Sequence, residues 1–240
     1  LGVDIGSYSA KGVLLSVDGR IVATATRAHE MRVPAPGLAE HDAQQDWWGG
    51  FVAVTQQLLA QSGVDARQII SIGCSGIGPC MLPVDARGQP LRQAVLYGID
   101  TRAKDEIVEM TQRYGEAFLL RHSGNALTTQ AVGPKVRWLA KNEPEVFRKA
   151  ARIVGCPTYL VQRLTGHCIV DHYGAANYPP FYDIERCAWA PNVTRDTCDP
   201  SLLPEVGWTT DIAGHVTPEV AQATGLAAGT PVIVGTVDAA

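Results

Sequence analysis

The stretch Val3-Asp4-Ile5-Gly6-Ser7-Tyr8-Ser9-Ala10-Lys11-Gly12-Val13-Leu14-Leu15 opens the chain and decides how the rest is interpreted. An apolar strand ends in an acid, a Gly-Ser turn follows, and a basic residue leads into a second apolar strand. Gly6 permits a tight turn and the close approach of a ligand. The N–H groups of such a turn, with the Ser7 hydroxyl, can converge on phosphate oxygens. Asp4 can hold a hydrated magnesium ion. The pattern predicts a phosphate-binding hairpin, although an ordinary hairpin with a solvated aspartate looks the same.

The last ten residues repeat this pattern. An apolar strand at 231–235 runs into the turn residue Gly235, and an acid, Asp238, follows. Strand–glycine–acid turns therefore bracket the chain, and they indicate either one shared site or two unrelated turns, because strands commonly end in Gly and Asp.

Composition excludes several classes of protein. The 240 residues suit one large domain or two small ones, with 46% hydrophobic and 18% charged residues and a net charge of −4. No basic block is present, so we expect no nucleic-acid partner. No apolar run approaches the ~20 residues of a membrane span, so we expect no membrane partner.

The six cysteines form no CxxC pair and no zinc spacing. Scattered cysteines without a signal peptide are typical of a reducing compartment, so we expect a cytoplasmic protein.

Hydrophobic periodicity predicts an α/β layer fold that opens with a three-stranded meander. Asp42 is a good N-cap for the first helix, and Gln45 fits a capping box. Residues 177–210 show little periodicity and are predicted to be irregular. Strands are expected at 2–6, 11–17, 20–28, 69–75, 80–84, 94–97 and 231–235, and helices at 43–61, 102–114, 134–141, 143–149, 157–164 and 217–223.

Further short motifs follow one another along the whole chain, and their order and spacing are more specific than any one of them. They are Glu40-His41-Asp42 before Trp47-Trp48, Ile72 to Gly76, Ala94 to Arg102, Pro134-Lys135 before Trp138-Leu139, Tyr159-Leu160 before Leu164-Thr165-Gly166, Asp171 with Ala175-Ala176, and Gly235-Thr236-Val237-Asp238. With the opening hairpin they resemble the N-terminal domain of FGGY-type carbohydrate kinases, xylulokinases above all.

The resemblance implies a ribonuclease-H-like α/β domain of the actin/Hsp70/hexokinase-like ATPases over residues 1–240, with a mixed sheet flanked by helices. It implies ATP-dependent phosphorylation of a hydroxyl of a small sugar or polyol, with a pentulose-like acceptor, ATP and Mg²⁺. We expect the chain to be the substrate-binding half of such an enzyme. A C-terminal nucleotide-binding domain would be its partner, and a homodimer stays open.

The resemblance also implies roles for individual residues. Asp238 matches the catalytic base that deprotonates the sugar, and Asp4 matches the metal-side aspartate. We expect these two carboxylates on adjacent strand ends that face one cleft. The nucleotide-binding residues are expected to be Gly6, Ser7, Lys11 and Gly235, although Lys11 fits a surface charge equally well.

Substrate contacts are expected from four further residues. Asp100 matches an acid that binds substrate hydroxyls, and it should line the same cleft. A salt bridge to Arg102 is a compatible alternative. The full expected set is Asp100, Arg102, Ser75 and Gly76.

The chain departs from the family at the acceptor site. Ile77-Gly78-Pro79 stands where xylulokinases carry Gln-Met-His and glycerol kinases carry Arg-Glu, Gly98 replaces a frequent aromatic, and Ala239 replaces a frequent amide. We therefore expect a larger and less polar pocket, which puts xylulose and glycerol specificity in doubt. Backbone groups, Ser75 or other loops would then bind the acceptor.

Two other classes of protein share part of this pattern. A non-catalytic sugar- or nucleotide-binding or regulatory domain of the same fold is the alternative, but it would not need both terminal aspartates. An Hsp70-like or actin-like ATPase shares the hairpin but not the motifs from Trp47 to Asp171.

Overall fold

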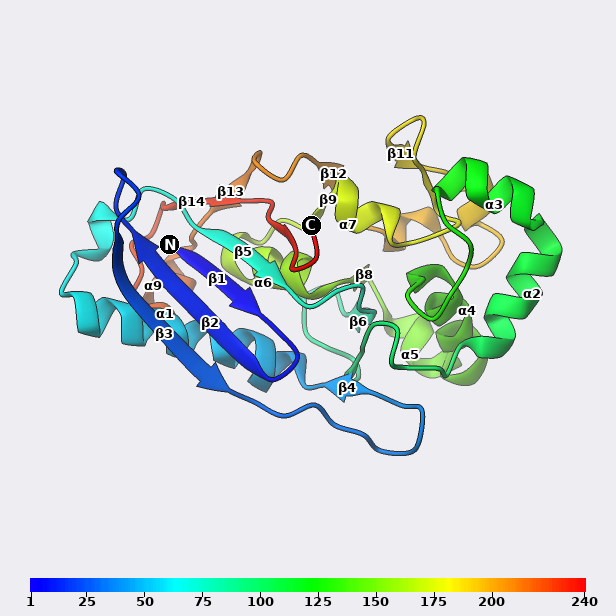
Figure 1. The fold of residues 1–240 in the computed structure, drawn as a ribbon, viewed down its shortest axis with the longest axis horizontal. Helices are drawn as coiled ribbons and strands as arrows, with labels where there is room; N and C mark the ends of the chain where they lie inside the picture. Colours follow the sequence, from blue (N-terminus) through cyan, green and yellow to red (C-terminus); the bar gives the residue numbers. More distant parts are fainter.

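The computed structural model describes all residues from Leu1 to Ala240. Its centre is a five-stranded sheet in the order β15-β5-β1-β2-β3 (Figure 1). The first three strands form an antiparallel meander, as predicted, and β5 and β15 add to its other edge in parallel. Their bounds are Gly2–Ile5 (β1), Ser9–Leu15 (β2), Ile21–Ala28 (β3), Gly73–Gly76 (β5) and Thr236–Val237 (β15). The chain therefore begins and ends in one sheet.

Alternation along β1 assigns its two faces. Val3 and Ile5 are buried in the core, whereas Asp4 between them is only partly buried on the opposite face. Successive side chains of a strand point to opposite faces, so one face packs and the other carries polar groups.

The first helix begins where the capping signal predicts it. The Asp42 carboxylate accepts hydrogen bonds from the backbone N–H groups of the next turn. Asp46, rather than Gln45, accepts the N–H of Asp42 and so completes the cap. One feature was not predicted: a π-helical turn, Ala43–Trp48, precedes helix α1, Gly49–Ser62. A π-helical turn contains more residues than an α-helical turn, so it shifts the register of the helix that follows.

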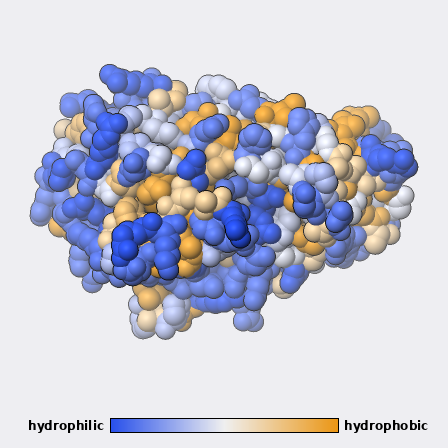
Figure 2. All heavy atoms as spheres, turned by 180° about the vertical axis from the view of Figure 1, so that it is seen from behind, coloured by the Kyte–Doolittle hydropathy of each residue, from blue (hydrophilic) through white to orange (hydrophobic).

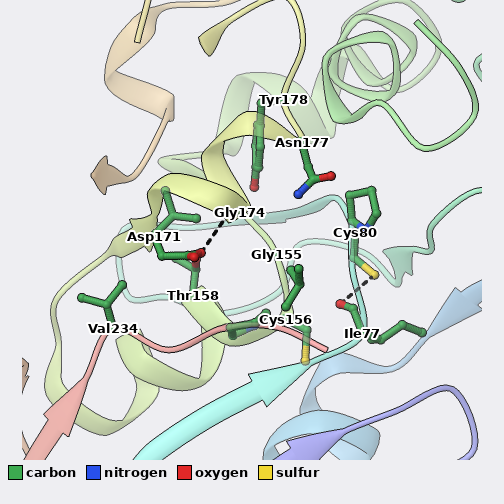
Figure 3. Close-up of a pocket in the computed structure, with 14 residues that line it drawn as sticks. Ile77, Cys80, Gly155, Cys156, Thr158, Asp171, Gly174, Asn177, Tyr178 and Val234 are labelled. Carbon is green, nitrogen blue, oxygen red and sulfur yellow. Dashed lines mark hydrogen bonds between the residues drawn. The ribbon is translucent and has the colours of Figure 1, made fainter. Parts of the chain in front are cut away.

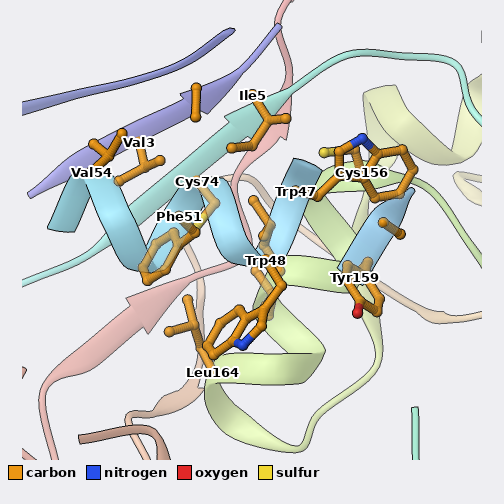
Figure 4. Packing of buried hydrophobic residues seen from close by; sticks show 14 of the residues in the cluster. Val3, Ile5, Trp47, Trp48, Phe51, Val54, Cys74, Cys156, Tyr159 and Leu164 are labelled. Carbon is orange, nitrogen blue, oxygen red and sulfur yellow. The ribbon is translucent and has the colours of Figure 1, made fainter. Parts of the chain in front are cut away.

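The main core lies between the sheet, α1 and helix α6 (Cys156–Thr165), as Figure 4 shows. It contains 31 buried residues, including Phe51 and Tyr159. Trp47 and Trp48 are both buried there.

Four helices form a separate lobe around a smaller core of 14 buried residues (Figure 1). They are α2 (Lys104–Tyr114), α3 (Glu116–Ser123), α4 (Val132–Asn142) and α5 (Pro144–Lys149). Helix α3 was not predicted. Gly115, at φ 80°, separates it from α2. The start of α3 has no side-chain cap that the sequence could indicate.

Short strand pairs connect these parts. They are β4 (Glu40–His41) with β7 (Ala94–Val95), β6 (Leu82–Val84) with β8 (Arg152–Val154), β9 (Ile169–Asp171) with β12 (Glu205–Gly207), β10 (Tyr182–Asp183) with β11 (Ala188–Trp189), and β13 (Ile212–His215) with β14 (Pro231–Ile233). The remaining helices are α7 (His172–Ala176), α8 (Pro191–Thr194) and α9 (Pro218–Thr224), with 3₁₀ turns at Ala66–Gln68 and Pro200–Leu202. Strands β4, β8, β9, β13 and β15 and helix α7 were not predicted, because elements of two to five residues carry no readable period.

The surface agrees with the composition. The rear face of the molecule is mostly hydrophilic, with apolar atoms in scattered groups (Figure 2). None of the helices is long and apolar enough to cross a bilayer. All six cysteines are free thiols.

Candidate active site

A polar row crosses the sheet on the face turned away from α1. Asp4 on β1 stands opposite Lys11 on β2 and opposite Ser75 on β5, and Ser75 stands opposite Thr236 on β15. Paired positions of neighbouring strands point to the same face. Four strands thus present one polar side chain each to a common surface.

This row forms the floor of a cavity of about 430 Å³, which Gly235 and Thr209 also line. The Ser75 hydroxyl donates a hydrogen bond of 2.6 Å to Asp4 Oδ1 and so orients that carboxylate. Lys11 is exposed and forms no ion pair within the chain. The structure therefore brings four of the predicted site residues, Asp4, Lys11, Ser75 and Gly235, around one opening.

Two histidines hold the turn between β1 and β2. His29 Nε2 lies 3.0 Å from the Gly6 carbonyl, and His41 Nε2 lies 3.0 Å from the Ser7 carbonyl. Trp47 Nε1, which can only donate, lies 3.0 Å from His41 Nδ1. His41 must therefore be neutral, with its proton on Nε2. Burial lowers the pKa of His41 to about 4, which agrees with this tautomer.

The carbonyls of Gly6 and Ser7 are thus used, and the Gly6 N–H donates to the Ser9 carbonyl at 2.9 Å, but the next two amides of the turn are not used. The N–H groups of Ser7 and Tyr8 have no acceptor within the chain, and the Ser7 hydroxyl lies 3.2 Å from the Tyr97 hydroxyl. A Cβ on Gly6 would make only ordinary contacts, so the fold itself does not require glycine there. Sequence reasoning found the turn but missed the histidines, since nothing in the sequence links them to it.

Asp238 follows β15 at the edge of the same sheet. Its backbone N–H donates to the Gly76 carbonyl at 2.9 Å. Although the residue is exposed, partial burial and then the negative charge of Asp4 raise the pKa of Asp238. The two terminal aspartates therefore interact. The expectation of adjacent strands is wrong, because β5 lies between β1 and β15, and Asp238 does not line the cavity that Asp4 lines.

Two glycines let β15 approach the sheet. Gly235 has φ 72°, and a Cβ there would lie 2.1 Å from the Cys74 carbonyl oxygen. A Cβ on Gly78 would lie 2.4 Å from the Val237 side chain. The departure from the family at Gly78 thus has a packing reason.

Asp171 ties helix α7 to β15. Its Oδ1 accepts the Gly174 N–H at the start of the helix, as Figure 3 shows. Its Oδ2 accepts the hydroxyls of Thr209 at 3.2 Å and Thr236 at 2.9 Å. The carboxylate is buried, beside an apolar cavity of about 20 Å³. Asp171 therefore fixes the strand that carries Asp238.

A second open cavity, of about 480 Å³, begins next to Asp238 and extends to the helical lobe. It was not predicted from the sequence, because its walls come from separate segments. None of its lining side chains carries a charge. They are Gly78, Pro79, Asn125, Ala126, Thr128, Gln130, Ala131, Tyr173, Ala176, Asn177, Pro179 and Ala239.

Asp100 and Arg102 line neither of these cavities. The buried Asp100 carboxylate accepts the Ala39 N–H at 2.7 Å and pairs with Arg102 at 2.8 Å. Burial alone would raise the pKa of Asp100, but the hydrogen bonds from Arg102 and Ala39 outweigh it and lower that pKa. Arg102 also binds Glu40 and lies over the Trp138 ring. The structure thus favours the salt-bridge alternative for this pair.

Solved structures share this architecture. Over 99% of this chain and 48% of the other, the structure superposes on a xylulose kinase from Rhodospirillum rubrum with a TM-score of 0.94 and 32% sequence identity. This similarity confirms the predicted fold class, a ribonuclease-H-like domain of the actin/hexokinase-like ATPases.

Curated relatives give the same result. A xylulose kinase from Lactococcus lactis is 29% identical over 92% of this chain and 44% of its own length. An autoinducer-2 kinase from Yersinia enterocolitica is 29% identical over 98% of this chain and 45% of its own length. The chain thus spans about half the length of these relatives. The profile of the FGGY family of carbohydrate kinases, N-terminal domain, matches residues 1–240. This chain therefore belongs to the FGGY family of carbohydrate kinases.

Proposed function

We propose that the protein containing this chain transfers the terminal phosphoryl group of ATP to a hydroxyl of a small sugar or polyol, with Asp238 as the general base. One observation carries the proposal: Asp4 on the central strand β1 and Asp238 just after the edge strand β15, from opposite ends of the chain, lie at the same end of parallel strands of one sheet, and the charge of Asp4 raises the pKa of Asp238. Phosphoryl transfer requires this kind of convergence, because phosphate and acceptor must meet in line.

The phosphate side is the turn between β1 and β2. The unpaired N–H groups of Ser7 and Tyr8 fit phosphate oxygens, and Lys11 supplies the nearby positive charge. Gly6 fits close approach of a ligand, since packing gives no other reason for a glycine there.

Asp4 fits a magnesium ion held partly by water. The structure contains no group of three or more side chains that could hold a metal by themselves. Mg²⁺ usually needs only one or two carboxylates, with waters and phosphate oxygens completing its coordination. The Ser75 hydroxyl presents the Asp4 carboxylate in one orientation for this purpose. When bound, MgATP supplies the phosphoryl group and the ion neutralises its charge.

Asp238 accepts the proton of the acceptor hydroxyl. Its raised pKa brings its basicity closer to neutral pH, which improves a general base. Asp171 and the Gly76 carbonyl hold its strand from two sides.

The proposal changes the role of Asp100 and Arg102. The Asp100 carboxylate is occupied by the Ala39 N–H and by Arg102. We therefore propose that this pair fixes the segment around Gly98 and does not touch the acceptor. We further propose that a second domain completes the nucleotide site, in a cytoplasmic enzyme. The 1–240 chain alone should then bind MgATP weakly and turn over no sugar.

The test is a kinase assay of the full-length protein. ADP release is coupled to a panel of pentuloses, tetritols, glycerol and hexuloses. The proposal predicts release that depends on one class of acceptor. Binding of a sugar without any ADP release would instead favour the non-catalytic alternative.

A further inference from the structure

Gly98 is clamped by two consecutive side chains of the loop before α4. The Thr129 hydroxyl donates to the Gly98 carbonyl at 2.8 Å, and the Gly98 N–H donates to Gln130 Oε1 at 3.1 Å. Both backbone polar groups of Gly98 are thus paired with side chains 31 and 32 residues away. The clamp fixes the loop against the segment that leads to Asp100.

Only glycine at position 98 permits this arrangement. A Cβ there would lie 2.8 Å from Gln130 Nε2 and 2.9 Å from its Cδ, which is too close for real contacts. The Gly98 backbone is not in the left-handed region, so its conformation does not require glycine. Gln130 therefore occupies the space that a side chain at position 98 would need.

The clamp also orients the Gln130 amide. An N–H group faces one of its two terminal atoms, so that atom must be the oxygen. The two N–H bonds of Nε2 then have no acceptor within the chain. Gln130 lines the 480 Å³ cavity that starts beside Asp238, together with the polar side chains of Asn125, Thr128 and Asn177. The cavity thus contains the oriented amide donors of Gln130 and no charged side chain.

We infer that Gln130, seated in the space left by Gly98, donates hydrogen bonds to oxygens of a neutral polyhydroxylated acceptor and so determines acceptor specificity. The inference rests on the proposed function. It adds which residue binds the acceptor and that the acceptor carries no charge. A carboxylate on the acceptor would meet no cation on these walls and would lie near the negative charge of Asp238. A hydroxyl or carbonyl oxygen loses little there, because an amide N–H replaces its water.

The test measures acceptor binding by calorimetry and turnover by ADP release, both with the full-length protein. Three variants separate the roles of Gln130. Gln130→Met removes the donor and the acceptor, Gln130→Glu keeps an oxygen for the Gly98 N–H but removes the donors, and Gly98→Ala displaces an unchanged Gln130. Gln112→Glu, at an exposed position of α2, controls for added charge.

All three variants should raise the acceptor Kd and KM by roughly three- to tenfold, the effect of one or two neutral hydrogen bonds. The KM for MgATP should stay within about twofold of the wild-type value, and Gln112→Glu should change neither constant. Gluconate should bind at least about tenfold more weakly than its neutral counterparts.

Two results would overturn the inference. If Gln130→Glu binds the acceptor like the wild type while Gln130→Met does not, Gln130 only holds the loop. If gluconate binds more tightly than the neutral acceptors, the charge class is wrong. A wild-type protein that binds acceptor but releases no ADP refutes the kinase function alone, and the Kd values still decide the role of Gln130.

Discussion

Acidification should weaken the fold through His41, which supports the turn between β1 and β2. This side chain is fully buried, accepts the Trp47 N–H and donates to the Ser7 carbonyl. A second proton would oppose the Trp47 N–H. Burial, and then the charge of His29, lower the pKa of His41 from 6.5 to about 4; Arg32 adds to this lowering, and Asp46 partly offsets it.

The size of the effect follows from this difference in pKa. An unfolded chain takes up the proton near pH 6.5, whereas the folded chain resists it until about pH 4. Stability is therefore fully present above pH 6.5 and is lost as the pH falls toward 4. At about 1.4 kcal/mol per unit, the shift corresponds to roughly 3 kcal/mol.

Urea unfolding of the wild type and of His41→Gln at pH 7 and pH 4.5 measures this contribution. Gln can still donate to Ser7 and accept from Trp47, but it does not titrate. The wild type should lose about 2 to 3 kcal/mol more than the variant between the two pH values. All other titratable groups are the same in both proteins. Equal losses of stability in the wild type and the variant would therefore refute the reasoning.

Three further predictions concern the strand that carries the proposed base. Gly235→Ala should destabilise the fold by roughly 2–4 kcal/mol in urea unfolding, because its Cβ would meet the Cys74 carbonyl at 2.1 Å. Gly229→Ala, at φ 86° with open space around it, should cost only about 1 kcal/mol, and equal costs would contradict the steric argument. Asp4→Asn should lower the pKa of Asp238 in a carboxyl NMR titration, since a neighbouring negative charge is removed; an unchanged pKa would mean that the two groups do not interact. Asp171→Asn cannot accept the Gly174 N–H and the two threonine hydroxyls together, because one carboxylate oxygen becomes an amide donor, so kcat should fall roughly tenfold or more while the KM for MgATP stays unchanged. An unaltered kcat would show that this strand needs no such support.

The sheet and its polar row were largely predictable from the sequence. Alternation around Asp4 separates a core face from a polar face, and the glycine turn at Gly235 marks the end of a second strand, which is β14. Strand β15, which follows that turn and joins the central sheet, was not predicted. Both patterns are local, with a period of two residues, so neighbouring residues suffice to read them.

The supporting contacts were not predictable, because they join distant segments. His41 reaches the hairpin through a backbone carbonyl, which has no residue identity in the sequence. Gln130 meets Gly98 across 32 residues. Asp100 and Arg102 are two residues apart, a spacing that suits a salt bridge and a substrate contact equally, and only their burial favours the first.

The central claim is that Asp238 takes the proton of the acceptor hydroxyl. Its most direct test compares the full-length wild type with Asp238→Asn, on the best acceptor from the panel. The amide keeps the size and much of the hydrogen bonding but cannot accept the proton. The account predicts a kcat lower by roughly 10²–10⁴-fold, with acceptor binding retained. A kcat close to the wild-type value would contradict the account.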